Sequence, residues 1–230
     1  MLIASFSTGP WETNCYVIAA AERSACVIVD PGPDSAAVVE TIVESQGLTP
    51  AGVLATHGHL DHIAEAHTLC DTYRIGCWIH GADRHLLTDP VAGLGPTMAP
   101  LVEQLLGTTT LPEPAQVHEV VDTDRLTLAD LQFDVRHAPG HTPGSVLYEL
   151  ANPGVGPEAP DVLLSGDVLF AGAIGRTDLP GGSDEAMRHS LADVVLSVDD
   201  SRVVLPGHGL QTTMARERRT NPYLAHSYLT

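Results

Sequence analysis

Four potential metal donors stand within six residues at the end of a predicted strand. The apolar run Val53–Thr56 predicts a short buried strand, and four donor side chains follow it directly: His57, His59, Asp61 and His62. In a purely structural loop several of these groups would need buried hydrogen-bond partners to offset desolvation. The cluster therefore indicates a metal site. Alternating positions can direct the first two histidines to one ion and the last two donors to a second.

Three later segments repeat the order of strand end, glycine turn and donor. They are Ala138–Gly144 with His141, Leu164–Asp167 with its terminal aspartate, and Leu205–Gly209 with His208. Each segment alone is typical of an ordinary turn. Together, and in this order after the first cluster, they form a specific pattern of donors placed by loops at strand ends.

With these four segments the chain resembles the metallo-β-lactamase superfamily over nearly its whole length. The resemblance implies an α/β (α+β) fold of the αββα type, two mixed sheets packed face to face with helices outside, and a site at one edge of the sandwich. It implies that one metal is held by His57, His59 and His141, and a second by Asp61, His62 and His208. Asp167 would bridge the two ions.

The apolar periodicity gives a coarse map of the chain. Strands are predicted at residues 15–20, 26–30, 53–56, 76–79, 131–138, 145–150, 162–166 and 203–205. Helices are predicted at 34–46, from about His62 to Tyr73, at 98–106 and at 183–196, where Ser183 is a good N-terminal signal. We expect one domain over residues 1–230, with a lid or insertion at 86–114, a surface loop at 151–160 and a short tail at 211–230.

Charge and cysteine content narrow the class of protein. The formal net charge is −18 and the chain has no lysine, which argues against nucleic acid because phosphate binding needs a Lys/Arg footprint. Reduced thiols are expected, because the cysteines show no tight pairing; they are Cys15, Cys26, Cys70 and Cys77. Without a signal peptide or an apolar stretch near the ~18 residues of a membrane span, we expect a cytoplasmic protein that binds no membrane. Monomer and homo-oligomer both stay open.

The donor set also predicts a kind of chemistry. Two divalent ions carry about +4, and two carboxylates with one hydroxide remove about 3, so the site should stay positive and favour a small anionic substrate. Histidine with carboxylate suits zinc, while iron and manganese tolerate the same donors. A water shared by two ions has a lowered pKa, which predicts a hydrolase that uses neither serine nor cysteine. Asp61 would orient that nucleophile.

Within the superfamily the chain resembles a small glyoxalase II, or hydroxyacylglutathione hydrolase. The resemblance rests on the segments Thr13–Val17, Phe170–Gly182 and Glu217–Tyr223. It implies hydrolysis of S-lactoylglutathione or a related acyl thioester. Larger glyoxalase II enzymes carry an additional helical domain that helps to grip glutathione, and the short tail predicted here leaves the thiol portion of the substrate open.

Three arginines are candidates for a substrate carboxylate: Arg176, Arg218 and Arg219. A structural role competes with each of them. Arg176 can pair with Asp178 to hold its own loop, and the other two can belong to a solvated helix face.

Other functions follow from other readings of the same residues. Persulfide dioxygenases of the superfamily, which use one iron, share Gly175–Asp178, whereas the Leu179–Gly182 that follows favours the hydrolase. A non-catalytic binding protein would keep all seven donors without using them. β-Lactam hydrolysis is disfavoured because no secretion signal is recognised.

Overall fold

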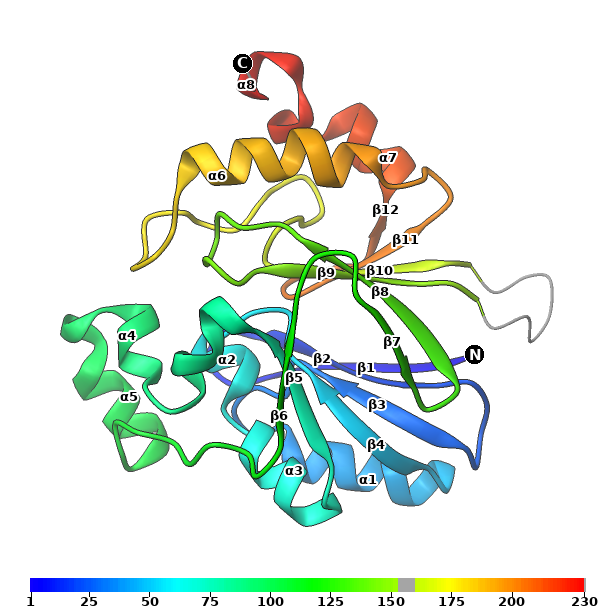
Figure 1. The fold of residues 1–230 in the computed structure, drawn as a ribbon, viewed down its shortest axis with the longest axis vertical. Coiled ribbons are helices and arrows are strands. Elements are labelled where there is room, and N and C mark those ends of the chain that lie inside the picture. The colour runs from blue at the N-terminus through cyan, green and yellow to red at the C-terminus, as the bar shows by residue number, and fades with distance from the viewer. Residues whose placement is uncertain (153–159, 230) are drawn as a thin grey trace.

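The structure is a computed structural model that describes residues 1–152 and 160–229. Within these residues two six-stranded sheets pack face to face, with helices on both outer sides (Figure 1). The predicted αββα sandwich is confirmed. Most of the surface loop predicted at 151–160 lies outside the described residues.

The first sheet has the order β1-β2-β3-β4-β5-β6. Its strands are β1 (Leu2–Thr8), β2 (Thr13–Ala19), β3 (Ala25–Val29), β4 (Thr49–Leu54), β5 (Gly76–His80) and β6 (Val117–Val120). The first three strands are antiparallel and the last four are parallel. Parallel neighbours need a crossover connection. Helix α1 (Ala36–Gln46) provides it between β3 and β4, the pair α2 (Leu60–Ile63) and α3 (Ala66–Tyr73) between β4 and β5, and residues 81–116 between β5 and β6.

The second sheet has the order β12-β11-β10-β9-β8-β7. Its strands are β7 (Arg125–Leu128), β8 (Leu131–His137), β9 (Val146–Leu150), β10 (Val162–Gly166), β11 (Val203–Pro206) and β12 (Thr212–Thr213). Only the pair β10 and β11 is parallel among these strands as described. Their crossover runs through α6 (Asp184–His189), which continues as a π turn and a short 3-10 turn to Ser197.

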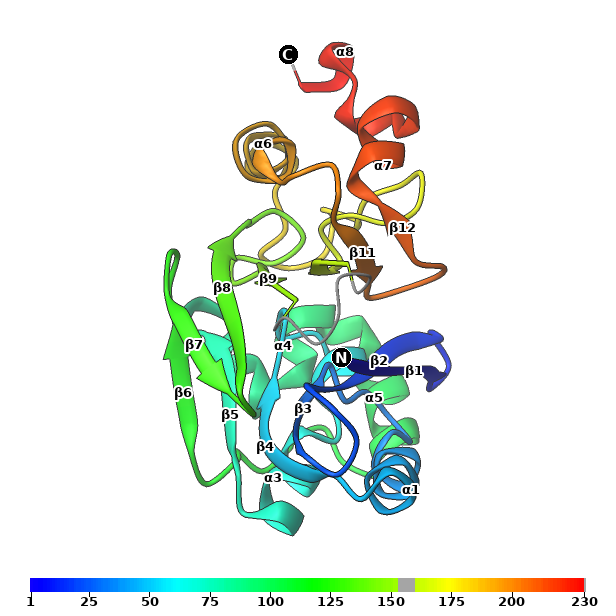
Figure 2. The ribbon, with the colours of Figure 1, turned by 90° about the vertical axis from the view of Figure 1, so that its right-hand side faces the viewer.

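The side chains of β2 alternate between two buried faces, which explains the continuous apolar run in its sequence. Tyr16 and Ile18 point into the core between the sheets, whereas Cys15 and Val17 belong to the core under α1 and α3. Successive side chains of a strand face opposite sides, and both sides of β2 are covered. Figure 2 shows the helices on the outer faces, with α6 and α7 (Met214–Thr220) above the second sheet.

The segment predicted as a lid or insertion at 86–114 forms its own small helical unit. It holds the end of a 3-10 helix (Gly81–Leu87), α4 (Pro90–Leu94), a further 3-10 turn (Pro96–Met98) and α5 (Ala99–Leu106). Buried Val102 packs with Leu60, and Leu94 packs against this cluster. The tail beyond residue 211 is also structured, because it supplies β12, α7 and α8 (His226–Leu229).

Two helix boundaries differ from the prediction. The helix expected from Asp34 begins at Ala36, because Asp34 has a left-handed backbone with φ of 64°. The helix expected to run from His62 to Tyr73 is interrupted near Glu65, whose backbone (φ −102°, ψ 7°) is not helical and whose N–H donates to Pro31 O. The strands β1, β6, β7 and β12 were not predicted from periodicity.

In the described part of the chain, the helices are too short or too polar to cross a membrane.

Candidate metal centre

The first donor loop leaves β4 and passes between the two sheets. Thr56 O accepts a hydrogen bond from Val146 N at 2.9 Å, so the loop is tied to the start of β9. At residue 58 a Cβ would lie 2.8 Å from Leu86 Cδ1 and 2.9 Å from the carbonyl oxygen of Asp83. Only glycine fits that space, which explains the residue between the first two histidines.

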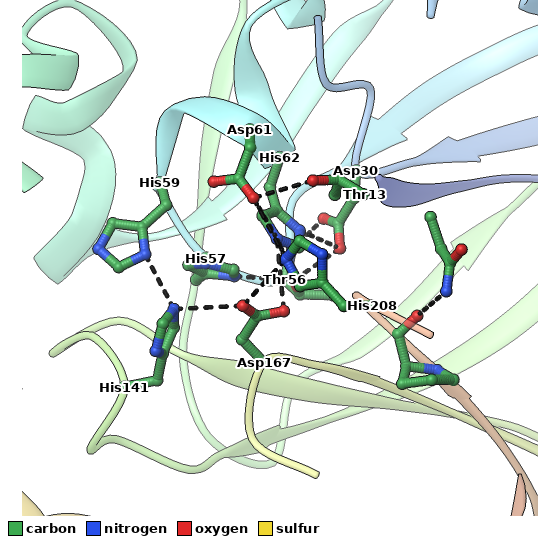
Figure 3. Close-up of polar contacts among 12 residues, drawn as sticks. Thr13, Asp30, Thr56, His57, His59, Asp61, His62, His141, Asp167 and His208 are labelled. Carbon is green, nitrogen blue, oxygen red and sulfur yellow. Dashed lines mark hydrogen bonds and ion pairs between the residues drawn. The ribbon is translucent and has the colours of Figure 1, made fainter. Parts of the chain in front are cut away.

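The predicted first donor set comes together in the structure. One nitrogen from each of His57, His59 and His141 lies within 4.8 Å of the others. His59 Nδ1 is 2.8 Å from His141 Nε2. All three rings are buried, and Figure 3 shows them converging from the loops after β4 and β8. The family resemblance implies that these three residues hold one ion.

The second set is also close. His208 Nε2 lies 3.2 Å from Asp61 Oδ2 and 3.4 Å from His62 Nε2. These three donors form a second group within the same 4.8 Å limit. His208 follows β11, so one strand from each sheet contributes to this group.

Asp167 lies between the two sets. Its Oδ2 is 3.5 Å from His141 Nε2 in the first set and 3.3 Å from His208 Nε2 in the second. Its Oδ1 is 3.4 Å from His62 Nε2. The carboxylate therefore lies between the two donor sets, where the resemblance places a bridging ligand.

The chemistry of the donors fits two divalent ions. His57 Nε2 and Asp167 Oδ1 are buried and have no hydrogen-bond partner, which is costly for a polar atom unless another ligand satisfies it. Burial lowers the pKa of His59 to about 3. Burial alone would raise the pKa of Asp61, but His62 and His208 beside it lower the value to about 2. At neutral pH both side chains are thus in the forms that bind metal. Burial alone would lower the pKa of His208, but its hydrogen bonds with Asp167 and Asp61 raise it to about 10, so a metal ion binding there has to displace that proton.

A cavity of about 550 Å³ opens onto the donors, a size in the range of about 300–1,000 Å³ that small-molecule sites occupy. Five donors line it: His59, Asp61, His141, Asp167 and His208. Its apolar walls are Trp11, Leu94, Met98, Phe170 and Leu179. The residues 86–114 thus contribute part of the wall, through Leu94 and Met98.

Comparison with known proteins agrees with this geometry. The family model described as "Metallo-beta-lactamase superfamily" matches residues 8–208. The chain belongs to this superfamily. An uncharacterized protein of Mycobacterium tuberculosis is 44% identical over 97% of the chain and 98% of its own length. The hydroxyacylglutathione hydrolase GloC of Haemophilus influenzae is 30% identical, over 93% of both chains.

Solved structures of the superfamily superpose closely. The crystal structure of BLEG-1 B3 metallo-β-lactamase has a TM-score of 0.82 and 35% identity, covering 97% of this chain and 99% of that one. TTHA1623 in a di-iron-bound form has a TM-score of 0.73 and 30% identity, covering 96% and 100%. One similar structure is therefore of a protein in a di-iron-bound form.

Two backbone carbonyls orient the histidines of this superfamily site. His141 Nδ1 lies 2.7 Å from Arg176 O, and His208 Nδ1 lies 3.0 Å from Trp11 O. Each ring nitrogen can donate to its carbonyl, which leaves the Nε2 lone pair facing the donor cluster. Such partners fix the tautomer of a metal-binding histidine.

Asp30 contacts the candidate site but is not among the residues predicted from the sequence. Its carboxylate accepts hydrogen bonds from Thr56 N and Thr56 Oγ1, both at 2.7 Å, and its Oδ2 lies 3.0 Å from His62 Nδ1. The signal was available, because Asp30 ends the predicted strand 26–30 and is followed by Pro31 and Gly32.

Asp83 is a second missed residue, and no signal in the sequence singles it out. It is fully buried. Its Oδ2 accepts from Gly58 N at 2.9 Å and from Thr142 Oγ1 at 2.6 Å, and its Oδ1 accepts from Gly144 N at 2.7 Å. One carboxylate therefore joins the loop of His57 and His59 to the loop of His141.

The three candidate arginines lie in different places. Arg176 lines the cavity, and its guanidinium binds both oxygens of Asp178 at 2.7 Å. Arg218 donates to Asp200 Oδ1 and to the carbonyls of Leu196 and Val198, so it fastens α7 to the turn before β11. In the described structure neither Arg218 nor the exposed Arg219 lines the cavity.

Proposed function

We propose that the chain is a metal-dependent hydrolase of acyl thioesters, of the hydroxyacylglutathione hydrolase type. The observation that carries the proposal is the meeting of two three-residue donor sets at Asp167, beside a cavity of about 550 Å³. His57, His59 and His141 would hold one ion, and Asp61, His62 and His208 the other. Zinc is the first expectation for both positions, with iron and manganese as the alternatives.

The segments that resemble glyoxalase II support the thioester reading by their contacts. From the first segment, Thr13 Oγ1 donates to Asp61 Oδ2 at 2.9 Å, and Asn14 Nδ2 donates to Gly209 O beside His208 at 2.9 Å. The second segment, Phe170–Gly182, supplies the cavity wall.

The third segment, Glu217–Tyr223, holds that wall in place. Glu217 Oε2 accepts from Gly172 N at 2.7 Å, and Asn221 Nδ2 donates to Ala173 O at 3.1 Å. All three segments thus serve this one site. The 30% identity to GloC over nearly the full length supports the same activity.

When bound, two divalent ions would supply a water of lowered pKa as nucleophile and would polarise the acyl carbonyl. The chain itself positions the attacking water and surrounds the reacting group with apolar side chains. Asp61, held by Thr13, is placed to orient the attacking water. The apolar walls would limit the contact of bulk water with the reacting carbonyl, and a less aqueous surrounding strengthens electrostatic interactions.

The test is hydrolysis of S-lactoylglutathione and of uncharged lactoyl thioesters by protein loaded separately with zinc, manganese and iron. We expect cleavage of at least one thioester, and its loss in His59→Ala. His189→Ala, which changes an exposed histidine on α6, is the matched control and should keep the activity. Full thioester cleavage by a folded His59→Ala variant would contradict the proposal.

Two other activities are tested in the same preparations. Oxygen uptake with glutathione persulfide, together with one iron per chain, would replace the hydrolase with the persulfide dioxygenase that shares Gly175–Asp178. Cleavage of a chromogenic β-lactam without thioester cleavage would favour the activity named for BLEG-1.

A further inference from the structure

The cavity offers very little positive charge to a substrate. The chain has no lysine, and none of its eleven basic residues falls in the segments outside the described residues. Of these arginines, Arg176 lines the cavity in the described structure. The other positive groups that a substrate meets there are the metal positions themselves.

The charge of Arg176 is already matched. Its Nε and one terminal nitrogen donate to the two oxygens of Asp178, each at 2.7 Å. This two-point geometry uses the Nε edge of the guanidinium, one of the edges that can bind a carboxylate at two points. The hydrogen bonds from Arg176 lower the pKa of Asp178 to about 2, so the pair is fully ionised near neutral pH and carries no net charge.

The walls on both sides of the donors are apolar and held in place. At the His208 end, the ring of Phe170 packs edge-on against the imidazole with centroids 5.9 Å apart, and Trp11 lies beside it through its carbonyl contact. At the other end α4 closes on His59, where a Cβ at residue 93 would lie 3.0 Å from His59 Cδ2. Leu94 and Met98 continue that side.

The net charge of the whole molecule also disfavours an anionic substrate. With a formal net charge of −18, the protein repels anions that approach it at low ionic strength. When bound between these residues, two divalent ions would supply positive charge to the reacting thioester group itself, which requires no carboxylate on the substrate.

We propose that the natural substrate is a thioester whose thiol carrier brings no net negative charge into the cavity. Glutathione and phosphate-bearing thiols are then poor carriers. Glutathione has two carboxylates, which would meet apolar walls and a neutralised arginine. Burying a carboxylate without a partner is strongly unfavourable. This inference rests on the proposed thioester hydrolysis, and it replaces the anionic substrate expected from the charge of the metal pair alone.

A matched pair of substrates tests the inference. S-lactoyl-N-acetylcysteamine and S-lactoylglutathione share the acyl group and the alkyl thioester bond, but only the second carries carboxylates. We expect kcat/KM to be at least ~10-fold higher for the neutral thioester, a difference of about 1.4 kcal/mol. The difference should shrink as salt is raised, because screening relieves only the repulsion of the anion.

A binding measurement separates recognition from chemistry. Calorimetry with the uncleavable thioethers S-butyl-N-acetylcysteamine and S-butylglutathione should give the same preference for the neutral compound. The outcomes distinguish the two proposals: if no thioester is cleaved, the proposed function is wrong. If S-lactoylglutathione is cleaved and bound as well as or better than the neutral compound, thioester hydrolysis stands and the neutral carrier is overturned.

Two substitutions test the role given to the Arg176 and Asp178 pair. Asp178→Asn releases the guanidinium, so the activity on S-lactoylglutathione relative to the neutral thioester should rise ~3-fold or more. Asp184→Asn, which breaks the exposed pair with Arg188 on α6, is the control and should leave that ratio unchanged. A fall of ~10-fold in the same ratio in Arg176→Gln would show that Arg176 already binds a substrate carboxylate, and would overturn the inference.

Discussion

Asp30 Oδ2 lies 3.0 Å from His62 Nδ1, on the opposite side of the imidazole from the donor cluster. The same carboxylate accepts from the backbone and hydroxyl of Thr56 at the start of the donor loop. A carboxylate behind a metal-binding histidine fixes the ring and raises its basicity. Asp30 therefore contacts the half of the site formed by Asp61, His62 and His208 directly, and it reaches His57 of the other half only through Thr56 Oγ1, which lies 3.2 Å from His57 Nδ1.

Asp30→Asn should weaken metal binding in that half. An amide keeps the shape of the carboxylate but loses its charge, and such changes cost about 10–100-fold in metal affinity. The measurement is competition with a graded series of chelators, with metal content read at each step. One ion should leave earlier than in the wild type, while the other keeps its affinity. Unchanged release of both ions would show that Asp30 only supports the fold.

Asp83→Asn should weaken the half of the site formed by His57, His59 and His141. Three donors converge on the two oxygens of Asp83, and an amide NH₂ would face at least one of them without an acceptor. An unsatisfied buried group costs about 1–3 kcal/mol, so urea unfolding of the metal-free protein should shift by that amount. The ion held by His57, His59 and His141 should also be released earlier.

A matched control for Asp83 is Asp71→Asn, which changes an exposed carboxylate on α3. It should alter neither unfolding nor metal content. If Asp83→Asn instead weakens the ion at Asp61, His62 and His208, the assignment of the two aspartates to separate halves is wrong.

The donors and the supporting residues differ in how far sequence could predict them. His57 follows a strand directly, and His141 and His208 follow strands through glycine turns, so local pattern was enough to find them. Asp83 is different, because its three partners lie 25 to 61 residues away along the chain and only the packed fold brings them near. Arg218 shows the opposite case. It belongs to a cluster of positive charge in the sequence, but in the structure its side chain donates hydrogen bonds that hold a turn.

Glu217→Gln should loosen the wall that carries Phe170. The buried carboxylate accepts from Gly172 N at 2.7 Å, Thr212 Oγ1 at 2.6 Å and Asn221 Nδ2 at 3.0 Å, and an amide cannot accept from all three. We expect KM for the best thioester to rise several-fold, with both ions retained because Glu217 touches none of the donors in the described structure. Steady-state kinetics with metal analysis checks this, and lost metal would place Glu217 in the centre itself.

Cys26 should make the protein sensitive to alkaline pH. Its side chain is fully buried, and burial raises the pKa of the thiol from its ordinary value of 9.0 to about 12. The unfolded chain then loses this proton at lower pH than the folded one, so the contribution is complete below pH 9 and is lost as pH rises toward 12. Cys26→Ala should therefore lose less unfolding free energy than the wild type between pH 8 and pH 10.5. The comparison uses urea unfolding at both values, and equal losses would assign the alkaline sensitivity to other groups.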